Sequence, residues 1–144
     1  MIKFQNERER DQVLHDLTVN MNEEFRATLQ YICHRISALP QDPAMAESFK
    51  SAALDEMSHI LFFSDLISRC GGVPEFDTWD IDKSTDIPTM LTSDIALEIE
   101  AKERYIQQVE RWKEYPELLN IIESVLVDEQ DHEEEFRRYL ESIR

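Results

Sequence analysis

The sequence predicts an all-α protein of one domain, residues 1–144, folded as a four-helix bundle with one long crossover between the second and third helices. Three observations support this fold class. Only two Gly and five Pro occur in the chain, so few residues are available for hairpin turns. Turn signals divide the chain into four long segments with helical periodicity. One interruption, from Gly71 to about Ile87, is much longer than the other two.

The turn signals place the four expected helices at residues 6–38, 44–70, 88–114 and 116–142. The first pair is interrupted by "LPQDP" at 39–43, and the second helix stops at "CGGVP" at 70–74. Asp86 is expected to cap the third helix, because Pro88 fits a first turn where its missing N–H costs nothing. Pro116 separates the third helix from the fourth.

The middle linker, roughly 17 residues long, contains Phe76, Trp79 and Ile81. A helix of about 27 residues is roughly 40 Å long, and 17 extended residues reach about 55 Å. The linker can therefore run the full length of the bundle, so that the second and third helices are parallel. Its apolar side chains are then expected to lie along the outside of the bundle.

Composition narrows the possible partners. A net charge of −16 repels the phosphate backbone, which argues against nucleic acid. No stretch approaches the roughly 20 apolar residues of a membrane span, and Met1 to Arg10 has no apolar core of a signal peptide. The sequence thus predicts a cytoplasmic protein that binds neither nucleic acid nor membrane. Cys33 and Cys70 have no Cys-x-x-Cys spacing, which excludes a rubredoxin-type or zinc-ribbon site within the chain.

An acid interrupts the apolar stripe of every expected helix. In the first helix the stripe includes Glu24 but not Glu23. The six polar residues that fall on the stripes are Glu24, Glu56, His59, Glu98, Glu129 and His132. A buried carboxylate without a partner is costly or takes up a proton, so four of them require compensating cations. Since four carboxylates and two neutral imidazoles balance two divalent ions, the pattern predicts a centre with two metals.

The two halves of the chain repeat this pattern. "DEMSH" at 55–59 and "DEQDH" at 128–132 each place a His three residues after a Glu. A lone Glu precedes each motif's Glu at almost the same distance, 32 residues for Glu24 and 31 for Glu98. Such an internal repeat of a helix pair predicts two half-sites that face each other across a pseudo-twofold axis.

Four segments resemble the site-bearing helices of the bacterioferritin family: "NEEFRATLQY" at 22–31, "DEMSH", "SDIALEIEAK" at 93–102 and "DEQDH". The resemblance covers nearly the whole chain from about residue 6 and implies a ferritin-like bundle. It also implies a ferroxidase that oxidises Fe²⁺ with O₂ or H₂O₂ for iron storage or detoxification. The implied ligands are Glu24 and His59 for one iron, Glu98 and His132 for the other, and Glu56 and Glu129 as bridges.

Four further residues have expected roles beside the metals. Asp55 and Asp128 are expected to accept the free N–H of the histidine from the opposite half, or else to be solvated helix residues. Tyr31 is expected to hydrogen-bond a ligand carboxylate or to donate an electron during oxidation, and Tyr105 is its mirror. Either tyrosine is otherwise an aromatic residue of the core. His15 and His34 have no Glu at the right spacing and are interpreted as ordinary residues.

Met57 stands where the bacterioferritin family has a Met that binds haem at a twofold subunit interface. Leu54, Met57 and Leu61 form a second apolar stripe, turned away from the core, which predicts at least a homodimer. Met57 then either binds haem or fills the interface. Only 12 residues follow His132, too few for the fifth helix of bacterioferritins, so a shell of about twelve subunits or a simple dimer is expected.

Two other functions fit the same residues. One is a di-iron peroxidase or oxygenase of rubrerythrin type, which would need a separate electron-transfer partner. The other is an interaction bundle whose metals are purely structural and which binds metal without turnover.

Overall fold

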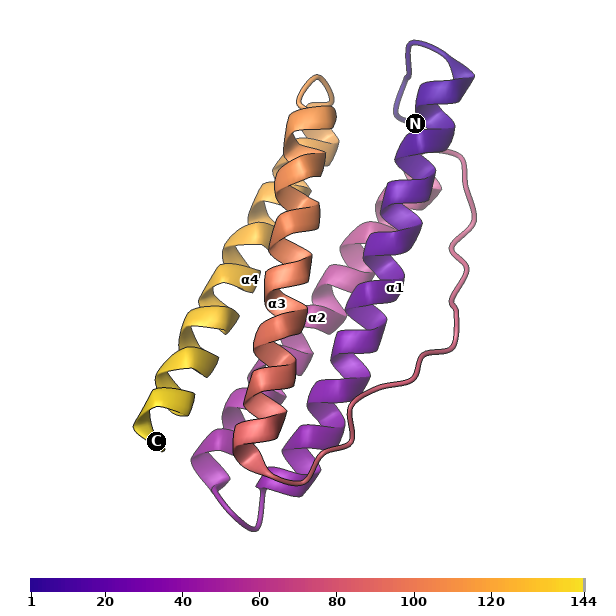
Figure 1. The fold of residues 1–144 in the computed structure, drawn as a ribbon. Helices are drawn as coiled ribbons and strands as arrows, with labels where there is room; N and C mark the ends of the chain where they lie inside the picture. The colour runs from indigo at the N-terminus through magenta and orange to yellow at the C-terminus, as the bar shows by residue number, and fades with distance from the viewer. Residues whose placement is uncertain (144) are drawn as a thin grey trace.

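The computed structural model describes residues 1–143 and contains four helices: α1 (Glu7–Ala38), α2 (Pro43–Arg69), α3 (Ile87–Arg111) and α4 (Pro116–Ser142) (Figure 1). The described residues contain no strand, which confirms the all-α prediction. All boundaries but one agree with the expected ones to within one residue. The exception is the end of α3, which stops at Arg111, because Trp112 to Tyr115 form a turn closed by a 3.0 Å bond from the Tyr115 amide to the Trp112 carbonyl.

Side chains that accept hydrogen bonds define where three helices begin. Asn6 accepts from the Glu9 amide at 2.8 Å, Asp42 from Met45 at 3.1 Å, and Asp86 from Thr89 at 3.0 Å. Proline occupies the first turn of α2, α3 and α4. After α2 the chain turns through Gly71, whose φ of 82° is strained for any residue with a side chain.

The crossover between α2 and α3 runs alongside α1, so that α2 and α3 are parallel as predicted (Figure 1). Polar side chains on the helix hold it there. Asn22 accepts from the Asp77 amide at 2.7 Å, and Gln30 accepts from the Asp82 amide at 2.9 Å. Buried amide side chains thus satisfy backbone groups of a segment that has no secondary structure of its own.

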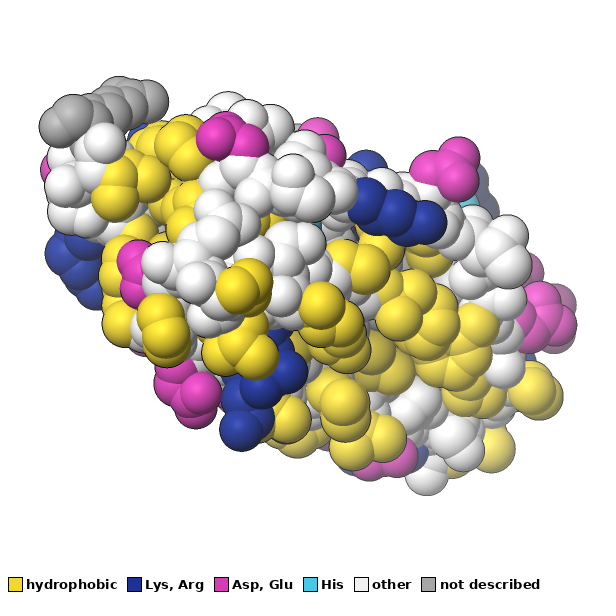
Figure 2. All heavy atoms as spheres, turned by 90° about the horizontal axis from the view of Figure 1, so that it is seen from below, with side chains coloured by type: hydrophobic (Ala, Val, Ile, Leu, Met, Phe, Trp, Pro, Cys, Tyr) yellow, Lys and Arg dark blue, Asp and Glu magenta, His cyan; other side chains and the backbone are white. Residues whose placement is uncertain are grey.

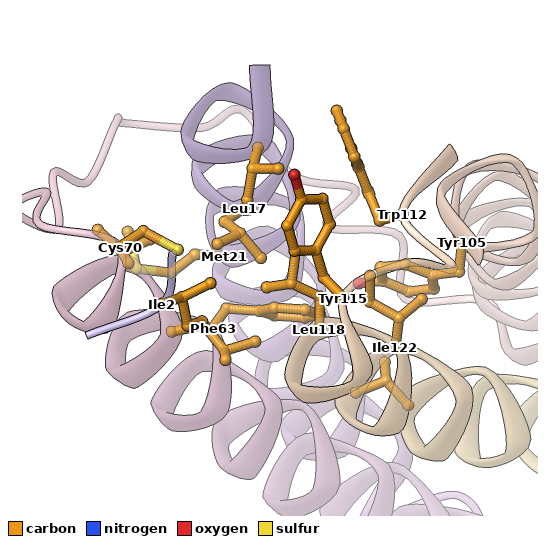
Figure 3. Packing of buried hydrophobic residues seen from close by; sticks show 14 of the residues in the cluster. Ile2, Leu17, Met21, Phe63, Cys70, Tyr105, Trp112, Tyr115, Leu118 and Ile122 are labelled. Carbon is orange, nitrogen blue, oxygen red and sulfur yellow. The ribbon is translucent and has the colours of Figure 1, made fainter. Parts of the chain in front are cut away.

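The apolar core consists of two clusters, one toward each end of the bundle. Figure 3 shows part of the first cluster, in which Phe63 lies among Leu17, Met21 and Tyr105. The second cluster includes Phe49, and its buried aromatic rings contact one another. On every helix the predicted metal ligands fall between residues of the first cluster and residues of the second. The bundle therefore places one polar layer between two apolar ones.

Many large apolar side chains remain exposed on the surface. On the face shown in Figure 2, hydrophobic side chains gather over a broad area, with acidic side chains mostly toward its edges. Leu54 and Leu61 are 53% and 61% exposed, and Met57, between them on α2, is 45% exposed. A search of the described helices for an apolar stretch long enough to cross a membrane finds none.

Candidate metal centre

Six side chains converge in the polar layer, each from a position where the apolar stripe of its helix is interrupted. They are Glu24 of α1, Glu56 and His59 of α2, Glu98 of α3, and Glu129 and His132 of α4. None is more than 5% exposed. They form two overlapping groups, in each of which one ligand atom from every residue lies within 4.8 Å of the others.

The two groups share a pair of carboxylates. One group comprises Glu24, Glu56, His59 and Glu129, and the other comprises Glu56, Glu98, Glu129 and His132. Glu56 and Glu129 thus belong to both, the position that a bridging carboxylate requires. Both groups are formed by residues of a single chain.

Each histidine is held from behind by an aspartate of the opposite helix. Nε2 of His59 lies 2.7 Å from Asp128, and Nε2 of His132 lies 2.8 Å from Asp55. Because each Nε2 faces a carboxylate, both Nδ1 atoms point toward the four glutamates. This is the arrangement in which a carboxylate fixes the tautomer and ring orientation of a metal-binding imidazole.

The two tyrosines contact the two glutamates that are not shared. The Tyr31 hydroxyl donates to Glu98, and the Tyr105 hydroxyl donates to Glu24 at 2.5 Å. Each bond crosses between α1 and α3. Burial, followed by the charge of the neighbouring glutamate, raises the pKa of both tyrosines well above its ordinary value. The hydroxyls therefore stay protonated and orient the carboxylates as donors.

Protons balance the acids when no metal is bound. Burial and then the charge of Glu129 raise the pKa of Glu56 and of Glu98 well above its ordinary value. Burial alone would also raise the pKa of Glu129, but hydrogen bonds from His59 and the neighbouring acids lower it to about 2. One central carboxylate is thus ionised, and protons partly neutralise the carboxylates around it.

The histidines take up protons for the same reason. Burial would lower the pKa of His59, but hydrogen bonds with Glu129 and Glu24 outweigh burial and raise it to about 11. For His132, the hydrogen bond with Asp55 and the nearby carboxylate of Glu98 likewise outweigh burial and raise the pKa to about 11. The site as a whole therefore attracts positive charge.

Several buried atoms of the site make no hydrogen bond of ordinary geometry among the described residues, although Nδ1 of His132 lies 3.1 Å from Glu56 and Nδ1 of His59 lies 3.3 Å from Glu129. They are both carboxylate oxygens of Glu56, Oε2 of Glu98, Oε1 of Glu129 and Nδ1 of His132. Orphaned buried polar atoms are costly and rare, and these all face one another. Two divalent ions would satisfy them together, and a donor set of oxygen and imidazole nitrogen without sulfur suits iron or manganese.

A small cavity lies beside the centre, between α1 and α3. Its volume is about 10 Å³, room for about one water molecule. Small side chains, Ala27 and Ala101, line it together with Glu23, Leu97 and Arg104, and it reaches four of the predicted ligands. The cavity is therefore the size of a single small molecule.

Sequence reasoning missed a second set of buried polar residues. His34, interpreted as ordinary, is fully buried between two aspartates, with Nδ1 2.6 Å from Asp94 and Nε2 2.9 Å from Asp82 of the crossover. Asn20 and Gln30 lie off the apolar stripe of α1, yet both are buried because that face packs against α3. The repeat contained a signal, since Asn20 and Asp94 each stand four residues before a lone Glu.

Comparison with known proteins supports this description of the fold. A family model described as Ferritin, a ferritin-like domain, matches residues 14–144. A search of curated proteins gives no match. Among solved structures, a bacterioferritin from Desulfovibrio desulfuricans, described with its diiron site in different catalytic states, is 25% identical. It superposes with a TM-score of 0.88 over 97% of this chain and 85% of that one.

Two further structures are below 25% identity and show the fold alone. A dodecameric thioferritin, the bacterioferritin-related protein of Bacteroides fragilis, is 22% identical, with a TM-score of 0.83 over 93% of this chain and 87% of that one. Rhodobacter capsulatus bacterioferritin, described with a metal-free dinuclear site and haem iron, is 23% identical, with a TM-score of 0.79 over 91% and 84%. Together these similarities confirm the predicted fold class and the resemblance to bacterioferritins.

Proposed function

The chain belongs to the ferritin-like domain family, and from that premise we propose that it is a ferroxidase, oxidising Fe²⁺ with O₂ or H₂O₂ at an intrasubunit di-iron centre. One observation carries the proposal. Six buried ligand atoms from four helices face one another as two overlapping groups, and several of them have no other partner in the described part of the chain. Among common protein sites, this donor set is typical of a pair of iron or manganese ions.

We assign the ligands by their position in the two groups. The proposed ligands are Glu24 and His59 for one iron, Glu98 and His132 for the other, and Glu56 and Glu129 for both. Two Fe²⁺ ions held side by side supply electrons to an oxidant. Sulfur ligands, which favour a structural zinc or an electron-transfer site, are absent from both groups.

The protein's own groups orient the ligands and hold protons. Asp55 and Asp128 keep the imidazoles turned toward the iron positions. Tyr105 and Tyr31 donate hydrogen bonds to the two unshared glutamates, and Tyr31 is also the residue to which we assign electron donation. Apolar layers on both sides exclude bulk water from the centre. We propose that a small reactant meets the centre at the cavity between α1 and α3.

We further propose that residues 1–144 act as one domain in a homo-oligomer, at least a dimer, that stores or detoxifies iron. The stripe of Leu54, Met57 and Leu61 supports a subunit contact, because all three are about half exposed on α2. The dodecameric thioferritin of similar fold supports a shell of about twelve subunits. Met57 is proposed either to bind haem at the dimer interface or to fill that interface without haem, since its thioether and its exposure fit both roles.

Oxidation and storage are tested separately by one experiment. Protein loaded anaerobically with Fe²⁺ is mixed with O₂ or with H₂O₂, the appearance of Fe³⁺ is followed by absorbance, and retained iron is counted after gel filtration. We expect oxidation at least about tenfold faster than for free Fe²⁺ at the same pH, and iron that elutes with the protein.

Two variants supply the matched comparison. Glu56→Gln removes a shared ligand at constant size and should abolish the acceleration, whereas Glu123→Gln removes an exposed acid of α4 and should leave it unchanged. Equal rates for Glu56→Gln and the parent would refute the site. Metal binding without any oxidation would favour a structural metal bundle instead. Turnover with H₂O₂ that needs an added electron donor and retains no iron would favour a rubrerythrin-type peroxidase.

A further inference from the structure

Two buried polar clusters flank the metal centre at equivalent positions of the internal repeat. A shift of 74 residues carries Glu24 onto Glu98 and Tyr31 onto Tyr105. The same shift relates Asn20, Gln30 and His34 on α1 to Asp94, Arg104 and Gln108 on α3. In space these six residues sort into two groups, each with members from both helices.

The first cluster lies one helical turn from Glu98. Gln30 donates to Asp94 at 2.7 Å, and His34 bridges Asp94 and Asp82. It contains one imidazole and two carboxylates. With Asp82 ionised, this cluster has no net positive charge, whether or not the imidazole carries a proton.

The second cluster lies one helical turn from Glu24. Asn20 and Gln108 exchange hydrogen bonds at 2.7 and 2.8 Å, and Arg104 donates to Asn20 at 3.2 Å. The guanidinium lies 4.9 Å from the ring centroid of Tyr105, whose hydroxyl contacts Glu24. Here an arginine stands where the other half has Gln30, and neutral amides replace the histidine and aspartate.

The positive charge of Arg104 is not cancelled by an ion pair. Among the residues that the structure describes, no carboxylate lies within ion-pair distance of its side chain. Glu23, which lines the small cavity beside the centre together with Arg104, pairs with Arg26 at 3.5 Å. The two metal positions thus differ in their surroundings although their six ligands are equivalent.

We infer that Arg104 makes the two metal positions unequal, so that the position of Glu98 and His132 fills first and the position of Glu24 and His59 holds the weaker, exchangeable ion. This inference rests on the proposed function, because it requires both metal positions to be real. A unit charge about 10 Å from one divalent ion and about 13–14 Å from the other, at an effective dielectric constant of about 20, makes their affinities differ roughly fourfold. The expected difference is therefore about fourfold.

Mn²⁺ tests the inference without oxidation, since it prefers the same oxygen and nitrogen ligands. Calorimetric titration of the full chain should give two binding steps per chain whose affinities differ at least about fourfold. Crystals given one equivalent of Mn²⁺ should show the stronger anomalous peak beside His132 and the weaker peak beside His59.

Variants at Arg104 separate its charge from its packing. Arg104→Gln gives the second half the residue that the first half has at Gln30, and it should reduce the difference to less than about twofold by tightening the weaker step. Arg104→Lys keeps the charge and should keep the difference. Equal affinities in the parent, first occupancy beside His59, or an Arg104→Gln protein that binds like the parent would overturn the inference while leaving the di-metal centre intact. Absence of any Mn²⁺ binding in the folded parent would instead contradict the proposed function.

Discussion

Loading the centre with metal should release protons, because the atoms that are proposed to bind metal hold protons without it. The pKa of His59 and of His132 is raised to about 11, since hydrogen bonds with carboxylates outweigh burial, so both imidazoles are charged at pH 7. Burial and the charge of Glu129 also raise the pKa of Glu56 and Glu98. Binding of two divalent ions at pH 7 is therefore expected to release about two to four protons per chain.

The affinity of the centre for metal ions should rise with pH, because protons compete with the metal for the same atoms. Each released proton makes the overall binding constant about tenfold larger per pH unit, which gives a rise of about 10²- to 10⁴-fold per unit near pH 7.

Calorimetry measures the proton count. Mn²⁺ is titrated at pH 6.5 and 7.5 in pairs of buffers that differ in ionisation enthalpy, and the difference in heat gives the number of protons released. Glu123→Gln, which removes an exposed acid, should release the same number as the parent. Release of less than one proton per chain, or an affinity independent of pH, would refute the protonation pattern derived from the structure.

Three further predictions concern stability in urea or on heating, with a chelator present. Glu56→Gln should stabilise the metal-free protein by about 1–3 kcal/mol at pH 7. The pKa of Glu56 is raised in the folded protein, so at pH 7 folding must protonate a carboxylate that is ionised in the unfolded chain, and glutamine removes this cost. An unchanged or lower free energy of unfolding would argue against this. His34→Gln should destabilise the metal-free protein by about 1–3 kcal/mol at pH 6. Burial would lower the pKa of His34, but hydrogen bonds with Asp94 and Asp82 outweigh burial and raise it. The stabilisation by protonated His34 is therefore fully present below the ordinary histidine pKa and is lost as the pH rises through the raised pKa. An equal loss of stability at pH 9 would contradict an ion pair between protonated His34 and the two aspartates. Phe63→Ala empties a fully buried position and should cost about 3–5 kcal/mol, whereas a loss below about 1 kcal/mol would contradict the packing of the first cluster.

The fold was predictable because it depends on residues next to the helix ends and on the lengths of the helices and linkers. Pro88 and Pro116 stand next to helix starts, and the length of the linker from Gly71 to Ile87 decides that α2 and α3 are parallel. The end of α3 was misplaced by three residues because the apolar periodicity continues through Trp112, whereas the chain already turns between Trp112 and Tyr115. A turn of this kind does not change the hydrophobic pattern.

The predicted ligands stood out because each is a charged residue on an apolar face, and the repeat marked the same residues twice. The polar clusters were not visible in this way. Asn20, Gln30 and Gln108 are amides on faces that read as polar, and only the packing of α1 against α3 buries them. His34 finds its second partner, Asp82, in a linker without periodicity, where no pattern indicates which side chain meets which helix.

Diffraction from crystals soaked anaerobically in Fe²⁺ tests the di-iron centre most directly. Data collected at the iron absorption edge are predicted to show two anomalous peaks within each chain, in the polar layer between the two apolar clusters. One peak should lie beside His59 and the other beside His132, with Glu56 and Glu129 in contact with both. A single peak per chain, or iron bound between two chains, would contradict an intrasubunit di-iron centre.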